Sequence, residues 1–599
     1  MSDGQRMLYR VITALVVLST VAGAGSSAPK ALTALPPRIS DVDRHYLTRL
    51  IRHTLLSRAQ DKPLPQPRLV PPALDDLQCQ IVVTLREGGF ARGIGVSDRT
   101  DAIAGARQAA ILAFESAKVG GADSEAFLNN VRIEVQALGE VVPFRSEKNW
   151  TEPGALDGFL TAGLDGVMLY LDQEQRWFTP AEMISKNVTL AEALRTLGKE
   201  VSLNPHVLNE ARLSKFRALH WWEFDDAGHI ASLVRGLSVV PQSDVTPVAI
   251  DAAIGRIGDY IVYRQLPQGR FTYSYNPAAV EYTDTDSEVA QSGATWAVAV
   301  YAAYRDAPPV RRALRRAIHA RLERWIEFPA AHGAFLTESD TRNRLGVTAQ
   351  FYLALNAATD GRRYASSRSS LLDAMLWLHQ SDGAILPAFP PARKLDTQER
   401  YSGQALLAFA QAYQNHPSQR LLDAIDSSFS FYRARFADRH LPAMVPWFSQ
   451  AYAIMARLTR KRAYADFVYE MSDLTLDYQL TPDNSDAPEM WGAFEAPGVF
   501  SAGASTALLL QGLCQAARTA RFFGDKERYQ RYKTACVLAT RFVMQLEFKP
   551  PECYFVKSPT DVLGGIRTSP VDVRLLIDNA QHALIGLVAV QQLLADDQP

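Results

Sequence analysis

Carboxylate and aromatic side chains gather in several loops in the second half of this 599-residue chain. One loop places Trp491 between Glu489 and Glu495, and another ends in Glu399 and Tyr401. Two facing carboxylates can act as acid and base, or as acid and nucleophile, when a glycosidic bond is broken. Trp and Tyr rings offer flat apolar faces on which a sugar can stack. The pattern therefore predicts a carbohydrate site with five candidate catalytic residues: Glu399, Glu489, Glu495, Asp578 and His582.

Further side chains of these loops could bind and orient a sugar. The candidates for substrate binding are Tyr273, Tyr275, Asp286, Glu338, Arg344, Tyr401, Trp447, Trp491 and Arg574. Structural roles remain open for several of them. Asp284, Asp286 and Ser287 come just before a predicted helix, where Asp and Ser are preferred N-caps. Glu338 and Arg344 could instead form a weak pair in a solvated loop.

Arg574, Asp578 and His582 are spaced four residues apart and therefore share one helical face. A structural ladder would show the same spacing as a catalytic group. A histidine near the mouth of a cavity can also titrate close to neutral pH.

Helices must position these loops. From residue 244 onward, apolar periodicity and chain breakers predict twelve helices. They lie near 246–264, 289–304, 308–326, 345–357, 364–380, 402–414, 417–435, 446–458, 461–478, 503–522, 526–547 and 574–594. Every second helix is rich in small and apolar residues and should be buried, whereas the others carry charged stripes that face water. Residues 244–599 are therefore predicted to form an (α/α) six-hairpin toroid of about twelve helices, with an open solenoid as the alternative.

Glycines recur near the starts of the buried helices, at 293, 346, 403 and 503, which indicates a repeat of roughly 50 residues. Three segments resemble the six-hairpin glycosidase superfamily and its epimerase relatives: Gly403–Ala408, Ala463–Asp473 and Gly564–His582. The resemblance implies a polysaccharide or oligosaccharide ligand in the toroid mouth. It also implies a reaction of the hydrolase, lyase or epimerase type.

Residues 69–240 show a mixed α and β pattern, with strands predicted over 80–85, 131–137, 166–171 and 218–224 and helices over 101–117 and 190–197. Four segments in this order resemble the AMMECR family: Val82–Leu85, Phe90–Gly95, Ile133–Val135 and Leu164–Met168. The resemblance implies an α+β domain. The signature cysteine of that family is missing at Gly93, where Gly93 and Gly95 are interpreted as a tight turn.

Residues 1–24 predict a secretory signal peptide, because Arg6 and Arg10 precede a short apolar run and an Ala-Gly-Ala site. The run is shorter than a spanning helix. The mature protein is therefore expected to be periplasmic or secreted, with no membrane span after cleavage. Residues 25–68 are predicted to be a proline-rich linker that includes a helical stretch near 41–60. A net charge of −1, from 63 Lys+Arg and 64 Asp+Glu, argues against a nucleic-acid partner. The oligomeric state stays open.

None of the four cysteines stands at zinc-site spacing, so neither a metal nor a cofactor is predicted. Cys514 and Cys536 lie equally far on either side of a turn near Asp525. Two antiparallel helices would place them at the same height. An oxidising compartment would permit a disulfide there, and two buried free thiols are the alternative.

Two functions are consistent with these observations. The first is an exported carbohydrate-active protein that acts on a polysaccharide or oligosaccharide in the toroid mouth. The alternative is a non-catalytic glycan-binding or assembly factor in the handling of cell-envelope polymers. Two carboxylates that face each other across the mouth would favour the enzyme, and their absence would favour the binder.

Overall fold

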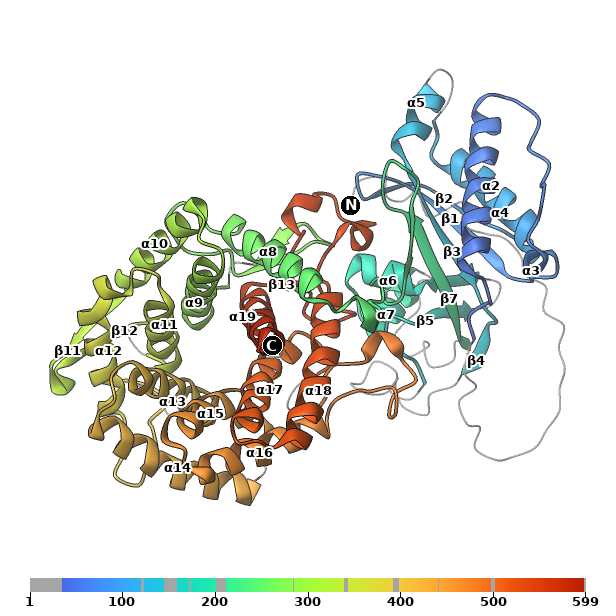
Figure 1. Cartoon of the computed structure of the whole chain (residues 1–599). Coiled ribbons are helices and arrows are strands. Elements are labelled where there is room, and N and C mark those ends of the chain that lie inside the picture. The colour runs from blue at the N-terminus through green and yellow to red at the C-terminus, as the bar shows by residue number, and fades with distance from the viewer. Residues whose placement is uncertain are drawn as a thin grey trace.

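The structure is a computed structural model that describes residues 35–119, 123–144, 159–171, 174–200, 212–283, 285–338, 343–390, 398–439, 441–496 and 501–596. An α+β domain comes first along the chain, and a ring of helices follows it (Figure 1). The predicted fold class is therefore confirmed. The predicted signal peptide, residues 1–24, lies outside the described residues.

The described residues from 244 onward contain twelve α-helices in six hairpins. The outer helices are α8 (Pro247–Tyr263), α10 (Pro308–Leu322), α12 (Ala365–Trp377), α14 (Gln419–Arg439), α16 (Arg462–Leu476) and α18 (Lys526–Gln545). The inner helices are α9 (Glu288–Tyr304), α11 (Leu345–Ala357), α13 (Gln398–Asn415), α15 (Val445–Thr459), α17 (Ser505–Phe522) and α19 (Ile577–Ala595). Each inner helix contacts the next, and α19 contacts α9, so the ring closes (Figure 1). The closed toroid is confirmed, and the open solenoid is wrong.

Burial separates the two sets of helices as the sequence predicts. In α11 every residue from Leu345 to Leu355 is buried, because both neighbouring inner helices and an outer helix pack around it. In α10 the buried side chains lie on one stripe, and exposed arginines occupy the opposite face. An apolar stripe opposite a charged face is typical of a helix on the surface of a globular domain.

Each inner helix also buries one glutamine that the sequence analysis did not single out. These are Gln291, Gln350, Gln404, Gln450, Gln511 and Gln581, each less than 9% exposed. Gln581 donates to Gln350 across α9, at 3.4 Å. Gly293 of α9 makes room for both, because a Cβ there would lie 2.0 Å from Gln581 Oε1. This polar contact joins α11 and α19, the two inner helices on either side of α9, and so helps to hold the ring.

A short turn with the pattern Gly-x-apolar precedes five of the six inner helices in the described residues. The five turns are Gly269–Phe271, Gly333–Phe335, Gly383–Ile385, Gly492–Phe494 and Gly564–Ile566. The glycine of each turn lies against the backbone of an outer helix: a Cβ on Gly492 would lie 2.0 Å from Leu538 O of α18. Gly492 also has a φ of 99°, which favours glycine. Each of the five turns therefore ties the connection within one hairpin to the outer helix of the next hairpin around the ring.

The N-terminal domain contains an eight-stranded antiparallel sheet with the order β2-β1-β3-β7-β5-β6, and β4 and β8 pair with β7. The strands are β1 (Gln80–Glu87), β2 (Phe90–Val96), β3 (Arg132–Leu138), β4 (Val142–Phe144), β5 (Asp165–Leu171), β6 (Glu174–Phe178), β7 (Arg212–Glu223) and β8 (Ile230–Leu233). Helices α2 (Asp41–Ala59) and α4 (Ala102–Ser116) cover one face, and α5 (Asp123–Asn130) contacts α2. Helices α6 (Pro180–Lys186) and α7 (Leu190–Glu200) contact strands β5, β6 and β7.

Two features of this domain differ from the sequence interpretation. Helix α2 lies inside the predicted linker 25–68, yet its Leu47, Ile51 and Leu55 are fully buried against α4 and the sheet. The domain therefore starts before residue 69. Gly93 and Gly95 lie in strand β2 and do not form a tight turn. A Cβ at either position would lie 2.1 Å or less from a backbone oxygen of α4, so both allow the strand to approach the helix closely.

The two domains share a buried interface. The Trp222 indole donates to Pro551 O at 2.8 Å, and the Tyr554 hydroxyl donates to Ala181 O at 2.9 Å. Trp222 also belongs to the same continuous apolar cluster as the toroid helices. Among the described residues, no helix combines the length and the apolar character that a membrane-spanning segment requires.

Candidate functional site

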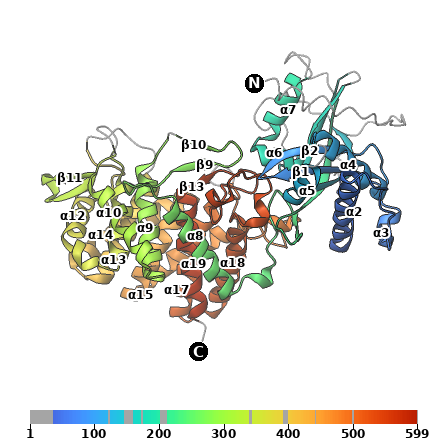
Figure 2. The same ribbon diagram turned by 90° about the horizontal axis from the view of Figure 1, so that it is seen from above.

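The candidate site lies at the end of the ring where the inner helices begin. Strands β9 (Ser274–Asn276), β10 (Glu281–Tyr282) and β13 (Leu575–Leu576) form a small antiparallel sheet at this mouth (Figure 2). Beside this sheet, Ile577 N donates to Tyr273 O at 2.9 Å. The sheet therefore joins Tyr273 to the first turn of α19, which carries Asp578.

Asp578 is the carboxylate whose surroundings suit proton transfer. Its Oδ1 is buried and has no hydrogen-bond partner among the described residues. Burial raises the pKa of the Asp578 carboxyl, and two backbone N–H groups and the charge of Arg400 offset this rise only in part. Desolvation, and then the charge of Asp578, raise the pKa of the neighbouring Tyr273 phenol. A carboxyl with a raised pKa can hold a proton at higher pH and act as a general acid.

His582 lies one turn further along α19 and forms part of an aromatic floor. Its ring meets the edge of Trp447 at a centroid distance of 5.9 Å, and Trp447 in turn packs on Trp296 at 6.3 Å. Gln511 Nε2 lies 3.3 Å from His582 Nδ1. Desolvation, and then the charge of Arg400, lower the pKa of His582 to about 4. His582 is therefore neutral at neutral pH.

Trp447 is 2% exposed. Its ring is enclosed by its neighbours, so it supports the site from below and has no open face on which a sugar could stack.

Arg344, Glu338 and Tyr401 form a hydrogen-bonded group at the starts of α11 and α13. Arg344 Nε donates to Glu338 Oε2 at 2.6 Å, and its Nη2 donates to the other carboxylate oxygen. Arg344 Nη1 donates to the Tyr401 hydroxyl at 3.2 Å. Both oxygens of Glu338 are therefore occupied. This paired geometry fixes the guanidinium at the mouth more firmly than an isolated surface pair would.

Asp286 is also occupied, by Arg270 at 2.6 Å and by Gln291 Nε2 at 2.9 Å. Burial opposes its charge, but these hydrogen bonds outweigh that effect and lower the pKa of Asp286. The N-cap of α9 is the neighbouring Ser287, whose side chain accepts from Ala290 N. Asp286 thus acts as an ion-pair partner, while the capping role falls to Ser287.

The Glu489–Glu495 loop lies elsewhere. Glu489 is 4% exposed and pairs with Arg235 of the N-terminal domain, while its backbone oxygen accepts from Gln545 of α18. The Trp491 indole donates to Ser485 O at 2.8 Å, and Glu495 is exposed. This loop contains the Gly492 turn, so it belongs to the repeated connection between helices. The structure does not group Glu489 and Trp491 with Asp578.

Tyr275 and Arg574 lie near the mouth but face other partners. Tyr275 is 2% exposed, and its ring packs on Tyr282 and under Arg264. Arg574 is held by Asp572 through Nε and Nη2, at 2.9 and 2.5 Å.

Arg400 is a mouth residue that the sequence analysis missed. It is exposed in the first turn of α13, and its charge acts on both Asp578 and His582 from across the ring. The sequence feature that could have identified Arg400 was its position directly after Glu399. The Glu399 side chain itself lies outside the described residues. Within the described residues, no group of three or more His, Cys, Asp or Glu side chains could hold a metal ion.

No family model matches the chain, and no curated protein matches it. Among solved structures, an α-1,6-mannanase of Salegentibacter sp. is 9% identical and has a TM-score of 0.43, and the match covers 57% of this chain and 99% of that one. A cellobiose 2-epimerase of Bacillus thermoamylovorans is 10% identical with a TM-score of 0.44, covering 57% and 98%. An uncharacterized protein of Pyrococcus horikoshii is 19% identical with a TM-score of 0.29, covering 33% and 98%.

Proposed function

We propose that this protein is an exported carbohydrate-active enzyme that takes a segment of a polysaccharide or oligosaccharide into the toroid mouth. In this proposal Asp578 donates a proton to the departing group of the sugar. One observation carries the proposal: Asp578 combines a buried, unpartnered Oδ1 with a raised pKa at the open end of the inner helices. Such a carboxyl stays protonated at a pH where ordinary aspartates are charged.

The neighbouring side chains have complementary roles in this proposal. The half-buried Tyr273 would contact the sugar beside the acid, and the exposed Arg400 would bind its oxygen atoms. Glu399, directly before Arg400, is the proposed second carboxylate, acting as base or nucleophile.

A substrate screen with a variant of the acid tests this proposal. The purified full chain is incubated with neutral and uronic-acid polysaccharides, and the products are sized. Asp578→Asn is expected to lower kcat about 10²- to 10⁴-fold with little change in KM, because it removes the proton donor. The control Asp466→Asn changes an exposed carboxylate on α16 and should keep full activity. Wild-type activity is expected to fall as the pH rises through the pKa of Asp578. Equal kcat values for Asp578→Asn and wild type would refute the assignment.

A non-catalytic glycan-binding protein is the second candidate, and a specific observation favours it. Asp286, Glu338 and Glu489, three of the predicted acidic residues, are each engaged by an arginine. Calorimetric titration with the same polysaccharides distinguishes the two functions. Binding without product formation, unchanged in Asp578→Asn, would favour the binder.

Export is part of the proposal and rests on residues 1–24 alone. Expression of the full chain in a Gram-negative host, followed by N-terminal sequencing of the periplasmic protein, tests it. A mature N-terminus near residue 25 is expected. Recovery of the uncleaved chain from the cytoplasm would contradict export.

A further inference from the structure

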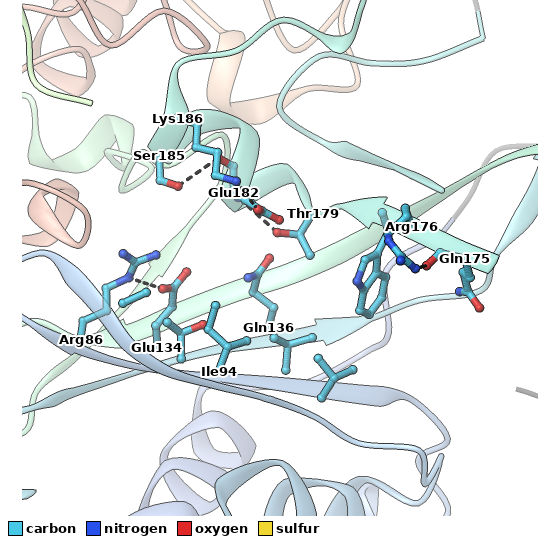
Figure 3. A pocket seen from close by; sticks show the side chains of 15 residues that line it. Arg86, Ile94, Glu134, Gln136, Gln175, Arg176, Thr179, Glu182, Ser185 and Lys186 are labelled. Atoms are coloured by element: carbon cyan, nitrogen blue, oxygen red, sulfur yellow. Dashed lines mark hydrogen bonds and ion pairs between the residues drawn. The ribbon is translucent and has the colours of Figure 1, made fainter. Parts of the chain in front are cut away.

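A cavity of about 290 Å³ lies in the N-terminal domain (Figure 3). Strands β1, β2 and β3 form its floor, β6 forms one side, and α6 lies over it. The floor is largely apolar, with Val82, Ile94 and Val96, and Trp177 stands at the side. The volume suits a small organic molecule, near the lower limit of typical ligand pockets.

Strand register explains why polar groups lie in this cavity. Val82 pairs with Val96 and Gln136, so these three side chains point to the same face of the sheet. The intervening residues, such as Val83 and Val135, point to the other face and pack on α2 and α4. The alternation in β3 thus sends Glu134 and Gln136 to the cavity face. That face is covered as well, because Glu134 is 1% exposed and Gln136 is 5% exposed.

The charge of Glu134 is balanced within the protein. Arg86 and His220 both contact its carboxylate. Burial opposes the charged form, but the attraction of Arg86, followed by the contacts with His220, lowers the pKa of Glu134 to about 2. The Arg86 guanidinium also lies over the Tyr554 ring of the toroid domain, at 5.2 Å. The charge of Glu134 is therefore balanced without a charged ligand at this end of the cavity.

Gln136 differs from Glu134 because its amide oxygen is unsatisfied. Its Oε1 is buried and has no hydrogen-bond partner among the described residues. Figure 3 shows its side chain pointing from β3 toward Thr179 and α6. A carboxamide presents an acceptor and a donor side by side. A buried amide oxygen without a partner is unfavourable, so a ligand that donates to it would be favoured.

We propose that this cavity binds a small, neutral, planar heteroaromatic molecule that carries an N–H donor beside an acceptor, paired with the amide of Gln136. The flat ring lies between the aliphatic floor and the underside of α6, next to Trp177. This site is separate from the toroid mouth and does not depend on the function proposed there.

Two probes that differ in a single donor test the proposal on the full-length wild-type chain. The first is 2-quinolinone, which carries N–H beside C=O, and the second is 1-methyl-2-quinolinone, which lacks the donor. Dissociation constants are measured by ligand-observed NMR. We expect 2-quinolinone to bind about tenfold or more tightly than its methylated analogue, as one well-made buried hydrogen bond requires. Equal affinities, or no binding of 2-quinolinone at millimolar concentration, would overturn the proposal.

Variants then locate the binding. Gln136→Leu should remove the difference between the probes, and Ile94→Trp should abolish the binding of both by filling the cavity. Gln108→Leu, on α4 beyond the opposite face of the sheet, is the matched control and should bind as wild type does. Thermal unfolding verifies that each variant is folded. Undiminished binding of 2-quinolinone to a folded Ile94→Trp protein would place the ligand elsewhere and refute the site.

Discussion

Asp578 and His582 lie one turn apart on α19, and burial shifts their pKa values in opposite directions. The pKa of the acid is raised and that of the imidazole is lowered, so burial favours the uncharged form of both groups. Arg400 acts on both from α13, favouring charge on the acid and opposing it on the imidazole. At the residue scale, burial at this mouth therefore raises the pKa of an acid and lowers the pKa of the histidine beside it.

His582 should make the stability of the protein pH-dependent. Its pKa falls from 6.5 to about 4 on folding, so the stability it contributes is present above pH 6.5 and is lost as the pH falls toward 4. That shift corresponds to roughly 3 kcal/mol. The free energy of unfolding of wild type and His582→Gln is measured by urea unfolding at several pH values between 7 and 4. Wild type should lose roughly 3 kcal/mol more than the variant. Parallel profiles would show that His582 is not buried in its neutral form.

At the scale of elements, close approaches of backbone to backbone set the packing. The Gly-x-apolar turns pack against outer helices, and β2 packs against α4 through Gly93 and Gly95. The short side chains of Ala109 and Ala113 on α4 complete that contact. Small residues are required at these positions because the backbones of two elements come into contact there.

Gly95→Ala should therefore destabilise the N-terminal domain. The new Cβ would lie 2.0 Å from Ala109 O and 2.4 Å from Ala113 N, both backbone atoms that cannot move aside without shifting α4. We expect a loss of about 1–3 kcal/mol or more in the free energy of unfolding. Gly361→Ala is the control, because its new Cβ meets the flexible end of Arg368 at 3.0 Å and should cost less than about 1 kcal/mol. Equal stability of the two variants would contradict this packing.

Helices α17 and α18 bring Cys514 and Cys536 together as the sequence predicts, with a sulfur–sulfur distance of 3.6 Å. A disulfide requires about 2.05 Å, so the structure has two free thiols joined by a weak hydrogen bond. Burial raises the pKa of the Cys536 thiol, which keeps it protonated and unreactive. Alkylation under denaturing, non-reducing conditions should label all four cysteines, as measured by mass. Protection of two of them would show that the bridge forms in the purified protein.

At the scale of the whole molecule, the contacts between the domains include buried polar groups. Arg235 and Glu489 form an ion pair across the interface, with side chains 10% and 5% exposed. Arg541 of α18 adds positive charge near Glu489 and donates to Trp491 O. The loop in which Trp491 lies between Glu489 and Glu495 therefore joins the domains.

Glu489→Gln should weaken this junction, because it leaves Arg235 buried without its counter-charge. The expected loss is on the order of 3 kcal/mol, with earlier proteolytic cleavage between the domains. Calorimetry and timed proteolysis measure the two effects. Asp466→Asn, in an exposed pair with Arg462, should cost about 1 kcal/mol or less. A variant Glu489→Gln as stable and protease-resistant as wild type would show that the pair contributes nothing.

The sequence by itself determined the twelve helices, their alternation between buried and charged, and the main strands of the N-terminal sheet. These features are local, because the burial of a helix such as α11 follows from the spacing of its own apolar residues. The sequence also placed Cys514 opposite Cys536, because a hairpin with a short turn fixes which residues meet.

Only the tertiary structure decided which chemical groups meet and which remain unpaired. Glu489 and Asp578 are both predicted catalytic carboxylates, yet one is neutralised by Arg235 from another domain and the other has an unpartnered oxygen at the mouth. Gln136 is an ordinary alternating residue until β1, β2 and α6 enclose it. The physical reason is that desolvation and charge pairing depend on neighbours distant in the chain, whereas apolar periodicity depends only on the segment itself.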